Sequence, residues 1–177
     1  MEYRLNVDRV GWRRKENAFV SLDRVFQFGK SEISVYPPEW SSKYGDTAER
    51  SRSTLDDWKT EVGAVTIQST VATVMMSAAF AAPLLTIMNR PSFIINACGE
   101  SKTGKTAGML GAASVVGIGD EDRLPNWNAT PAALLESCKA FNDQIMPLNE
   151  LGLLKGKAED IAAQIARVDI RLRRGPR

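Results

Sequence analysis

Residues 99–106 read Gly-Glu-Ser-Lys-Thr-Gly-Lys-Thr, a complete G-x-x-x-x-G-K-[ST] pattern that decides which fold and ligand the sequence predicts. This is the phosphate-binding P-loop, in which glycines permit a tight backbone path and backbone N–H groups surround phosphate oxygens. A short apolar run at residues 93–95 precedes it, and apolar residues at helical spacing follow it. We therefore predict a strand, a loop and a helix in that order, with the helix N-terminus directed at the phosphates.

The pattern predicts a nucleoside triphosphate, ATP, as the ligand, with Mg²⁺ as its metal. Lys105 is expected to reach the β- and γ-phosphate oxygens and to act as a catalytic residue, while the Thr106 hydroxyl is expected to hold Mg²⁺. The remaining alternative is a chance glycine-rich turn between a strand and a helix. The predicted nucleotide-binding residues are Gly99, Glu100, Ser101, Lys102, Thr103, Gly104, Lys105 and Thr106.

A second apolar run, residues 144–148, ends in Asn149 and Glu150, where a P-loop ATPase carries acids beside its metal. We predict Asn149 near Mg²⁺ and Glu150 as the catalytic group that orients the attacking water. An amide adds no negative charge beside a divalent cation, so Asn149 in place of an aspartate should weaken magnesium binding. The alternative is a buried strand with a polar end, and Pro147 is awkward within a central strand.

Composition limits the chemistry that the chain can perform. At 177 residues and 44% hydrophobic, it can bury a core, and its net charge of +2 does not by itself argue for nucleic acid. Cys98 and Cys138 lack metal-ligand spacing, and the absence of histidine removes the usual zinc ligand and general base. Residues 1–15 hold no apolar signal-peptide core, so we expect a cytoplasmic protein.

Three regions follow along the chain. Residues 1–52 are strand-rich and end in a polar loop, with β-type runs at 18–20, 25–28 and 33–36; residues 53–90 are helical; residues 91–177 form a partial P-loop core. In the last region, Thr130 and Pro131 are expected to begin a helix over 132–140. The predicted fold class is α/β, a partial three-layer P-loop sandwich with a parallel sheet, preceded by a strand-rich and a helical segment.

Residues 62–88 are apolar and long enough to span a bilayer. Polar residues such as Gln68, Ser69 and Thr73 interrupt the run, and polar groups facing lipid are costly. We therefore predict no membrane contact and a buried helix or helix pair, kinked or broken at Pro83. The four tryptophans are expected to pack rather than to stack on nucleic-acid bases.

Over most of its length the chain resembles the family catalogued as domain of unknown function 927, helicase-like P-loop ATPases of phages, plasmids and other mobile elements. The resemblance implies a Mg-dependent ATPase that works on element DNA, forms homo-oligomers and carries an extra catalytic glutamate. The matching segments are Gly11-Trp12-Arg13 with Ala18-Phe19-Val20 and Asp23, Leu55-Asp56-Asp57-Trp58, residues 77–85, the P-loop, Ala112-Ala113-Ser114-Val115, Trp127-Asn128-Ala129-Thr130 and Leu148-Asn149-Glu150-Leu151-Gly152.

Two departures from the family pattern set a second hypothesis beside the first. Asn149 stands where the pattern has an aspartate, and no sensor residue or arginine finger can be placed after the helix-like residues 157–168, so we expect a truncated core. The basic run at 170–177 either contacts DNA phosphates or, as we favour, is a solvated tail. The chain is then either an ATP-hydrolysing enzyme acting on DNA or a non-catalytic nucleotide-binding or assembly module.

Overall fold

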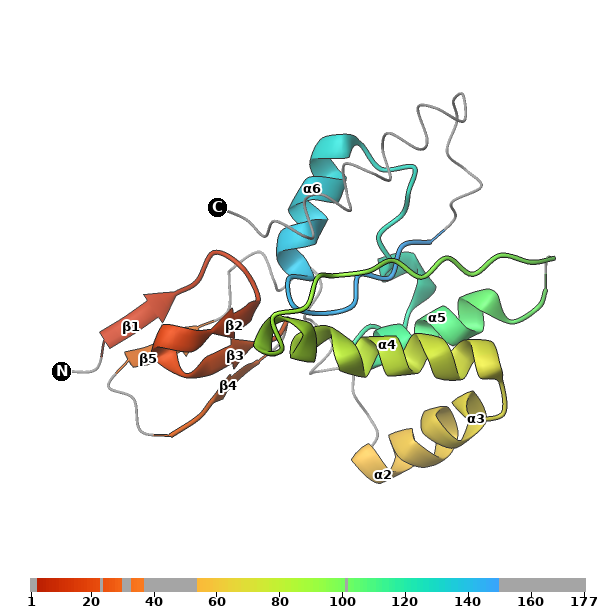
Figure 1. Cartoon of the computed structure of the whole chain (residues 1–177), viewed down its shortest axis with the longest axis horizontal. Coiled ribbons are helices and arrows are strands. Elements are labelled where there is room, and N and C mark those ends of the chain that lie inside the picture. The colour runs from red at the N-terminus through yellow and green to blue at the C-terminus, as the bar shows by residue number, and fades with distance from the viewer. Residues whose placement is uncertain (1–2, 23, 30–32, 37–53, 101, 150–177) are drawn as a thin grey trace.

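The computed structural model of the chain describes residues 3–22, 24–29, 33–36, 54–100 and 102–149. The strands gather at one end of the molecule and the longer helices at the other (Figure 1). The strands are β1 (Tyr3–Asn6), β2 (Gly11–Arg13), β3 (Ala18–Val20), β4 (Val25–Gln27) and β5 (Ile33–Tyr36). The α-helices are α2 (Leu55–Trp58), α3 (Ala64–Thr66), α4 (Thr70–Ile87), α5 (Lys105–Ser114) and α6 (Pro131–Ala140). A π-helical turn, Lys59–Gly63, joins α2 to α3, and 3-10 turns lie at Arg14–Glu16 and Glu121–Arg123.

The N-terminal strands form two small sheets. Strands β2, β3 and β4 make an antiparallel sheet in that order, while β1 and β5 pair in parallel. Alternation along β3 gives the larger sheet two faces, because Ala18 and Val20 are buried while Phe19 between them points to the opposite face. The buried face supplies part of the main core.

That core brings together residues from distant parts of the sequence. Val20 and Leu22 from the sheet region pack in one cluster with Ile118 and Phe141, all at most 1% exposed. A smaller cluster joins Trp127 to Leu134 and Cys138 of α6, and Met146 packs against both clusters. The N-terminal sheet therefore shares its core with the segments that follow the P-loop helix.

Local sequence signals explain where the helices begin. The Thr130 side chain accepts a hydrogen bond from Ala133 N (3.2 Å), and Pro131 occupies the first helical position, which confirms the predicted start of α6. Helix α5 begins at Lys105, as the P-loop pattern predicts. Helix α4 begins after Ser69, whose side chain accepts from Ala72 N.

The predicted fold class is wrong, because the structure shows no parallel sheet around the P-loop in the part of the chain that it describes. Residues 93–95 are extended but belong to no strand, and Phe93, Ile94 and Ile95 are each 44–49% exposed. The nearest feature to a parallel ladder here is one isolated bridge between Asn126 and Asn149. A strand exists only through hydrogen bonds to a neighbouring strand, and residues 93–95 have none among the described residues.

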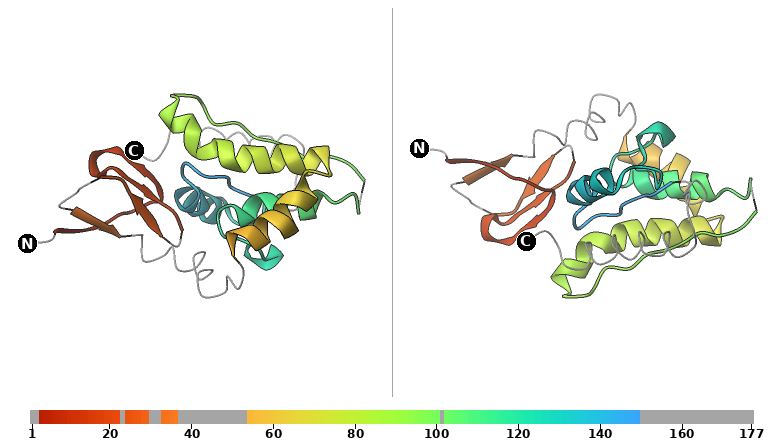
Figure 2. Two further views of the ribbon diagram at one scale, coloured as in Figure 1. Left: turned by 90° about the horizontal axis from the view of Figure 1, so that it is seen from below. Right: turned by 90° about the horizontal axis from the view of Figure 1, so that it is seen from above.

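The structure corrects two expectations for residues 62–88. Helix α4 continues through Pro83 to Ile87, so the predicted break does not occur there, while the predicted kink at this proline stays a prediction. The helix is also not buried, because only Met76 and Ala79 along it are. It packs against α5, and the two views of Figure 2 agree that these helices run side by side. By length and composition alone, Thr70–Ile87 could cross a membrane, with a mean hydropathy of 1.8.

Candidate nucleotide-binding site

The predicted phosphate loop follows the extended segment 91–98 and leads directly into α5. Gly99 and Gly104 have φ angles of +149° and +80°, a region that favours glycine, and Lys102 also adopts a positive φ of +65°. No side chain caps the start of α5 at Gly104. The first backbone N–H groups of a helix have no partner within the helix, so the first turn of α5 can donate to an anion.

The Lys105 side chain folds back across this loop. Its Nζ donates to the carbonyl oxygen of Gly99 (3.1 Å) and to Thr103 Oγ1 (3.1 Å), and also to the carbonyl oxygen of Glu100. The Thr103 hydroxyl in turn donates to Glu100 O at 2.9 Å. The ammonium thus lies among the loop atoms, where the oxygens of a phosphate could replace the carbonyls as its acceptors.

Close packing against α4 fixes the helix that carries Lys105 and Thr106. A Cβ added at Gly108 would lie 3.2 Å from Met75 Sδ and 3.3 Å from Ala72 Cα, so the absence of a side chain permits this approach. At the other end of α5, Trp58 Nε1 donates to Ser114 Oγ at 2.9 Å. These contacts hold the P-loop helix between α4 and the helical segment that contains Trp58.

Asn149 lies on a different segment and is held by residues 121–127. Its backbone N–H donates to Pro125 O (2.9 Å), and its carbonyl oxygen accepts from Trp127 N (3.2 Å). Its side-chain amide donates to Glu121 Oε1 at 3.0 Å. A carboxylate therefore lies beside the neutral amide, and the predicted role of Asn149 next to Mg²⁺ stays a prediction.

The structure brings together four of the predicted residues, Gly99, Glu100, Thr103 and Lys105, through the bonds of the Lys105 ammonium. Ser101 and Glu150 lie outside the described residues. Thr106 lies in the first turn of α5, and no hydrogen bond joins its hydroxyl to another described residue. Among the described residues, no group of three or more His, Cys, Asp or Glu side chains could hold a metal, and the role of the Thr106 hydroxyl beside Mg²⁺ stays a prediction.

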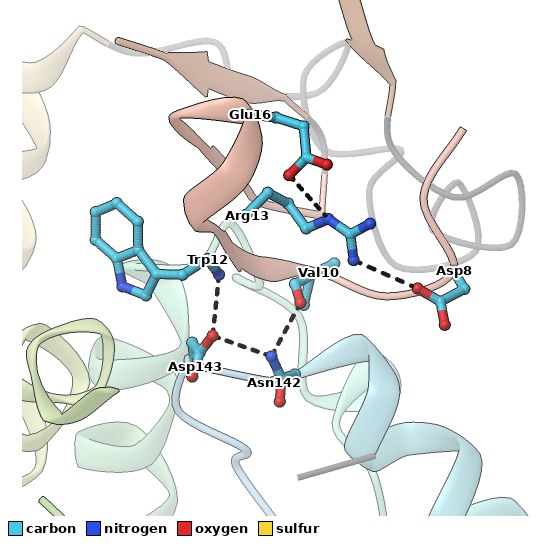
Figure 3. A network of polar contacts seen from close by, with 7 residues as sticks. All are labelled: Asp8, Val10, Trp12, Arg13, Glu16, Asn142 and Asp143. Atoms are coloured by element: carbon cyan, nitrogen blue, oxygen red, sulfur yellow. Dashed lines mark hydrogen bonds and ion pairs between the residues drawn. The ribbon is translucent and has the colours of Figure 1, made fainter. Parts of the chain in front are cut away.

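The segment that leads to Asn149 is fastened to the N-terminal sheet by a polar cluster, the Gly11 clasp, which consists of Val10, Gly11, Trp12, Asn142 and Asp143 (Figure 3). Trp12 N donates to Asp143 Oδ2 at 2.9 Å, while Asn142 Nδ2 donates to Val10 O (3.1 Å) and to Asp143 Oδ2 (3.0 Å). The approach is so close that a Cβ at Gly11 would lie 2.5 Å from atoms of both Asn142 and Asp143. Gly11, at φ +102°, is required for both reasons.

The clasp also reaches the end of α4. Trp12 Nε1 donates to Pro83 O at 2.7 Å, Arg14 Nη2 donates to Thr86 O at 2.7 Å, and the Thr86 hydroxyl donates to Asp143 Oδ1. Arg13 lies between Asp8 and Glu16, at 3.7 and 3.9 Å (Figure 3). The Gly11-Trp12-Arg13 segment, which the sequence marked only by resemblance, is thus a structural joint. In the sequence, the residues that contact this segment could be recognised only as a turn-forming pair, Asn142 and Asp143. Asp143 adopts a φ of +56° in the structure.

Comparison with protein families identifies a matching model. The family model described as "Domain of unknown function (DUF927)" matches residues 2–167. No curated protein and no solved structure matches the chain.

Proposed function

This chain belongs to the DUF927 family, and from that premise we propose that it binds a nucleoside triphosphate with magnesium at residues 99–106. The observation that carries the proposal is the position of the Lys105 ammonium, which lies against Gly99 O and Thr103 Oγ1 at the start of an uncapped helix. A cation and free backbone N–H groups converge there, which is the arrangement that polyphosphate binding requires.

Each part of the loop has a proposed role. Backbone N–H groups of the loop and of the first turn of α5 surround the phosphates, and the Lys105 ammonium exchanges its carbonyl acceptors for β- and γ-phosphate oxygens. The Thr106 hydroxyl holds Mg²⁺, which when bound neutralises phosphate charge. The glycines let the backbone lie close to the ligand. At Gly104 the positive φ alone requires glycine, because an added Cβ would meet no atom within 4 Å.

For the reaction, we propose a helicase-like ATPase of the cytoplasm that acts on DNA of a phage or mobile element, with Glu150 orienting the water that attacks the γ-phosphate. The extended segment and the uncapped helix serve binding, while turnover depends on acids near the phosphate. A second candidate is a non-catalytic nucleotide-binding or assembly module. It is favoured by Asn149, which supplies an uncharged amide that is already bonded to Glu121.

Nucleotide binding is tested with a fluorescent ATP analogue and magnesium. Lys105→Ala should lower the affinity at least about tenfold, because it removes the charge-assisted bonds to the phosphates. Lys59→Ala is the matched control, since it deletes an equal charge whose partner is Asp56 on the helical segment. Equal affinity in Lys105→Ala and the original chain would contradict the proposal.

Turnover separates the two candidates. ATP hydrolysis that DNA stimulates and that Glu150→Gln abolishes would establish the enzyme. Binding without hydrolysis, in both the original chain and Asn149→Asp, would establish the non-catalytic module instead. A gain of hydrolysis in Asn149→Asp alone would identify the missing carboxylate as the defect.

A further inference from the structure

The outward face of the β2–β3–β4 sheet carries a row of aromatic side chains. The sheet register pairs Trp12 with Phe19 and Phe19 with Phe26, so the three residues lie side by side across the strands. The rings of Trp12 and Phe19 meet edge to face, with centroids 4.9 Å apart. Phe28, just after β4, stacks on Trp12 with centroids 6.1 Å apart. The opposite face, with Ala18 and Val20, is the one that supplies the core.

The rings on this face differ in exposure. Trp12 abuts α4, where its indole bonds Pro83 O, and is only partly exposed. Phe26 on β4 and Phe28, which stacks on Trp12, are 48% and 52% exposed. These half-exposed rings contribute only part of the free energy that full burial would give. An exposed apolar patch of this kind is typical of an interaction site.

Exposed cations lie in the turns at both ends of these strands. Arg14 and Lys15 lie in the turn between β2 and β3, and Arg24 lies in the turn between β3 and β4. The Arg14 guanidinium is bonded to Thr86 O on α4. Two acids nearby, Asp8 and Glu16, are both in ion pairs with Arg13. Residues 1–36 as a whole hold seven Lys and Arg against five Asp and Glu. An occupant of this face should therefore combine flat apolar rings with negative charge.

We propose that this face binds single-stranded DNA, with bases stacked on Phe26 and Phe28 and the phosphates near Lys15 and Arg24. Every base offers a flat face to an aromatic ring, and basic side chains beside the rings follow the backbone, which together give sequence-tolerant binding of single strands. A duplex hides its base faces and could contact only the cations. The proposed surface shares its DNA partner with the proposed function but is separate from the P-loop.

The experiment measures anisotropy of a fluorescent oligothymidylate of about 20 nucleotides, titrated with the full chain at about 50 mM salt and without nucleotide. We expect binding that weakens with salt and is stronger than binding of a duplex of equal length. Phe26→Ala combined with Phe28→Ala should weaken it about tenfold or more. Lys15→Gln and Arg24→Gln should each reduce the salt dependence by about one phosphate contact.

Phe80→Ala is the matched control, because Phe80 is also 52% exposed but lies on α4, outside the sheet. It should leave the affinity unchanged, and Phe26→Leu, which keeps an apolar side chain without a ring, should behave like Phe26→Ala. Thermal unfolding checks that each variant is folded. Absent oligonucleotide binding, equal loss in Phe80→Ala, or unchanged affinity in the double variant would overturn the proposal. So would a shift of the original chain from dimer to monomer on Phe28→Ala, which would assign the face to a second copy. ATP binding is measured separately, so either proposal can fail alone.

Discussion

In the N-terminal region, Val20 on β3 and Leu22 just after that strand are at most 1% exposed, whereas on α4 the apolar residues Val71, Val74 and Leu84 are each about half exposed. The difference follows from how each element satisfies its backbone. A helix bonds its own N–H and C=O groups and can stand with one face uncovered, but a strand needs a partner. The sheet obtains its partners within the described chain and is locked by the Gly11 clasp. Residues 93–95 obtain no strand partner among the described residues.

The largest expected effect comes from opening the joint at its tightest point. Gly11→Ala should lower the free energy of unfolding by about 3 kcal/mol for two reasons. Alanine is strained at this positive φ, and its Cβ must displace Asn142 and Asp143. Thermal denaturation measures the loss. Gly29→Ala is the control, since Gly29 also has a positive φ, +75°, but a Cβ there meets no atom within 4 Å. Equal losses in the two variants would mean that the close approach at Gly11 is unimportant.

A smaller loss is expected from the acceptor within the clasp. Asp143→Asn should cost about 2 kcal/mol, because an NH₂ group replaces an oxygen that accepts from Trp12 N and Asn142 Nδ2 or from Thr86. Chemical denaturation provides the measurement. Asp56→Asn, in an exposed pair with Lys59, is the comparison and should change the free energy by less than about 0.5 kcal/mol. A clasp residue that behaved like this surface acid would not be holding the sheet in place.

On α4, the exposed face should tolerate what the buried face does not. Val74→Lys should change the free energy of unfolding by less than about 0.5 kcal/mol, because Val74 is 48% exposed. Met76→Lys, at a position 8% exposed, should cost about 1.5 kcal/mol, because an apolar side chain is lost from the helix contact and a charge is brought close to it. Urea denaturation of the pair gives both values. A large loss in Val74→Lys would show that the α4 face is covered in solution, for example by a second copy of the chain.

The smallest effect concerns the first turn of α2. Hydrogen bonds from the Thr54 backbone and side chain lower the pKa of Asp57 below its ordinary value of 3.8. The ionised form is thus favoured in the folded state, so its contribution is present above the ordinary pKa and is lost as the pH falls through the folded value. An NMR titration of the Asp57 carboxyl should show the lowered midpoint, and Thr54→Val should return it toward 3.8.

Local signals were enough for some elements and insufficient for others. Thr130 and Pro131 place the start of α6, and the P-loop pattern places the start of α5 at Lys105. The sequence could not show that residues 93–95 lack a strand partner in the described part of the chain, because a ladder depends on distant strands. For the same reason the sequence did not predict the hydrogen bond from Trp12 N to Asp143. It also did not predict the bond between Asn149 and Glu121, two residues that are 28 positions apart.

The Gly11 clasp has a consequence for how the chain is made. Trp12 and its partner Asp143 are separated by 131 residues, so the joint cannot close until nearly the whole described chain has been synthesised. At about 5–20 residues per second, the first sheet waits roughly ten seconds on the ribosome before its lock arrives. During that interval the apolar face with Val20 and Leu22 lacks Ile118 and Phe141, its later cover. The nascent N-terminal sheet should therefore be a chaperone client, and contacts of such long sequence separation predict slow refolding.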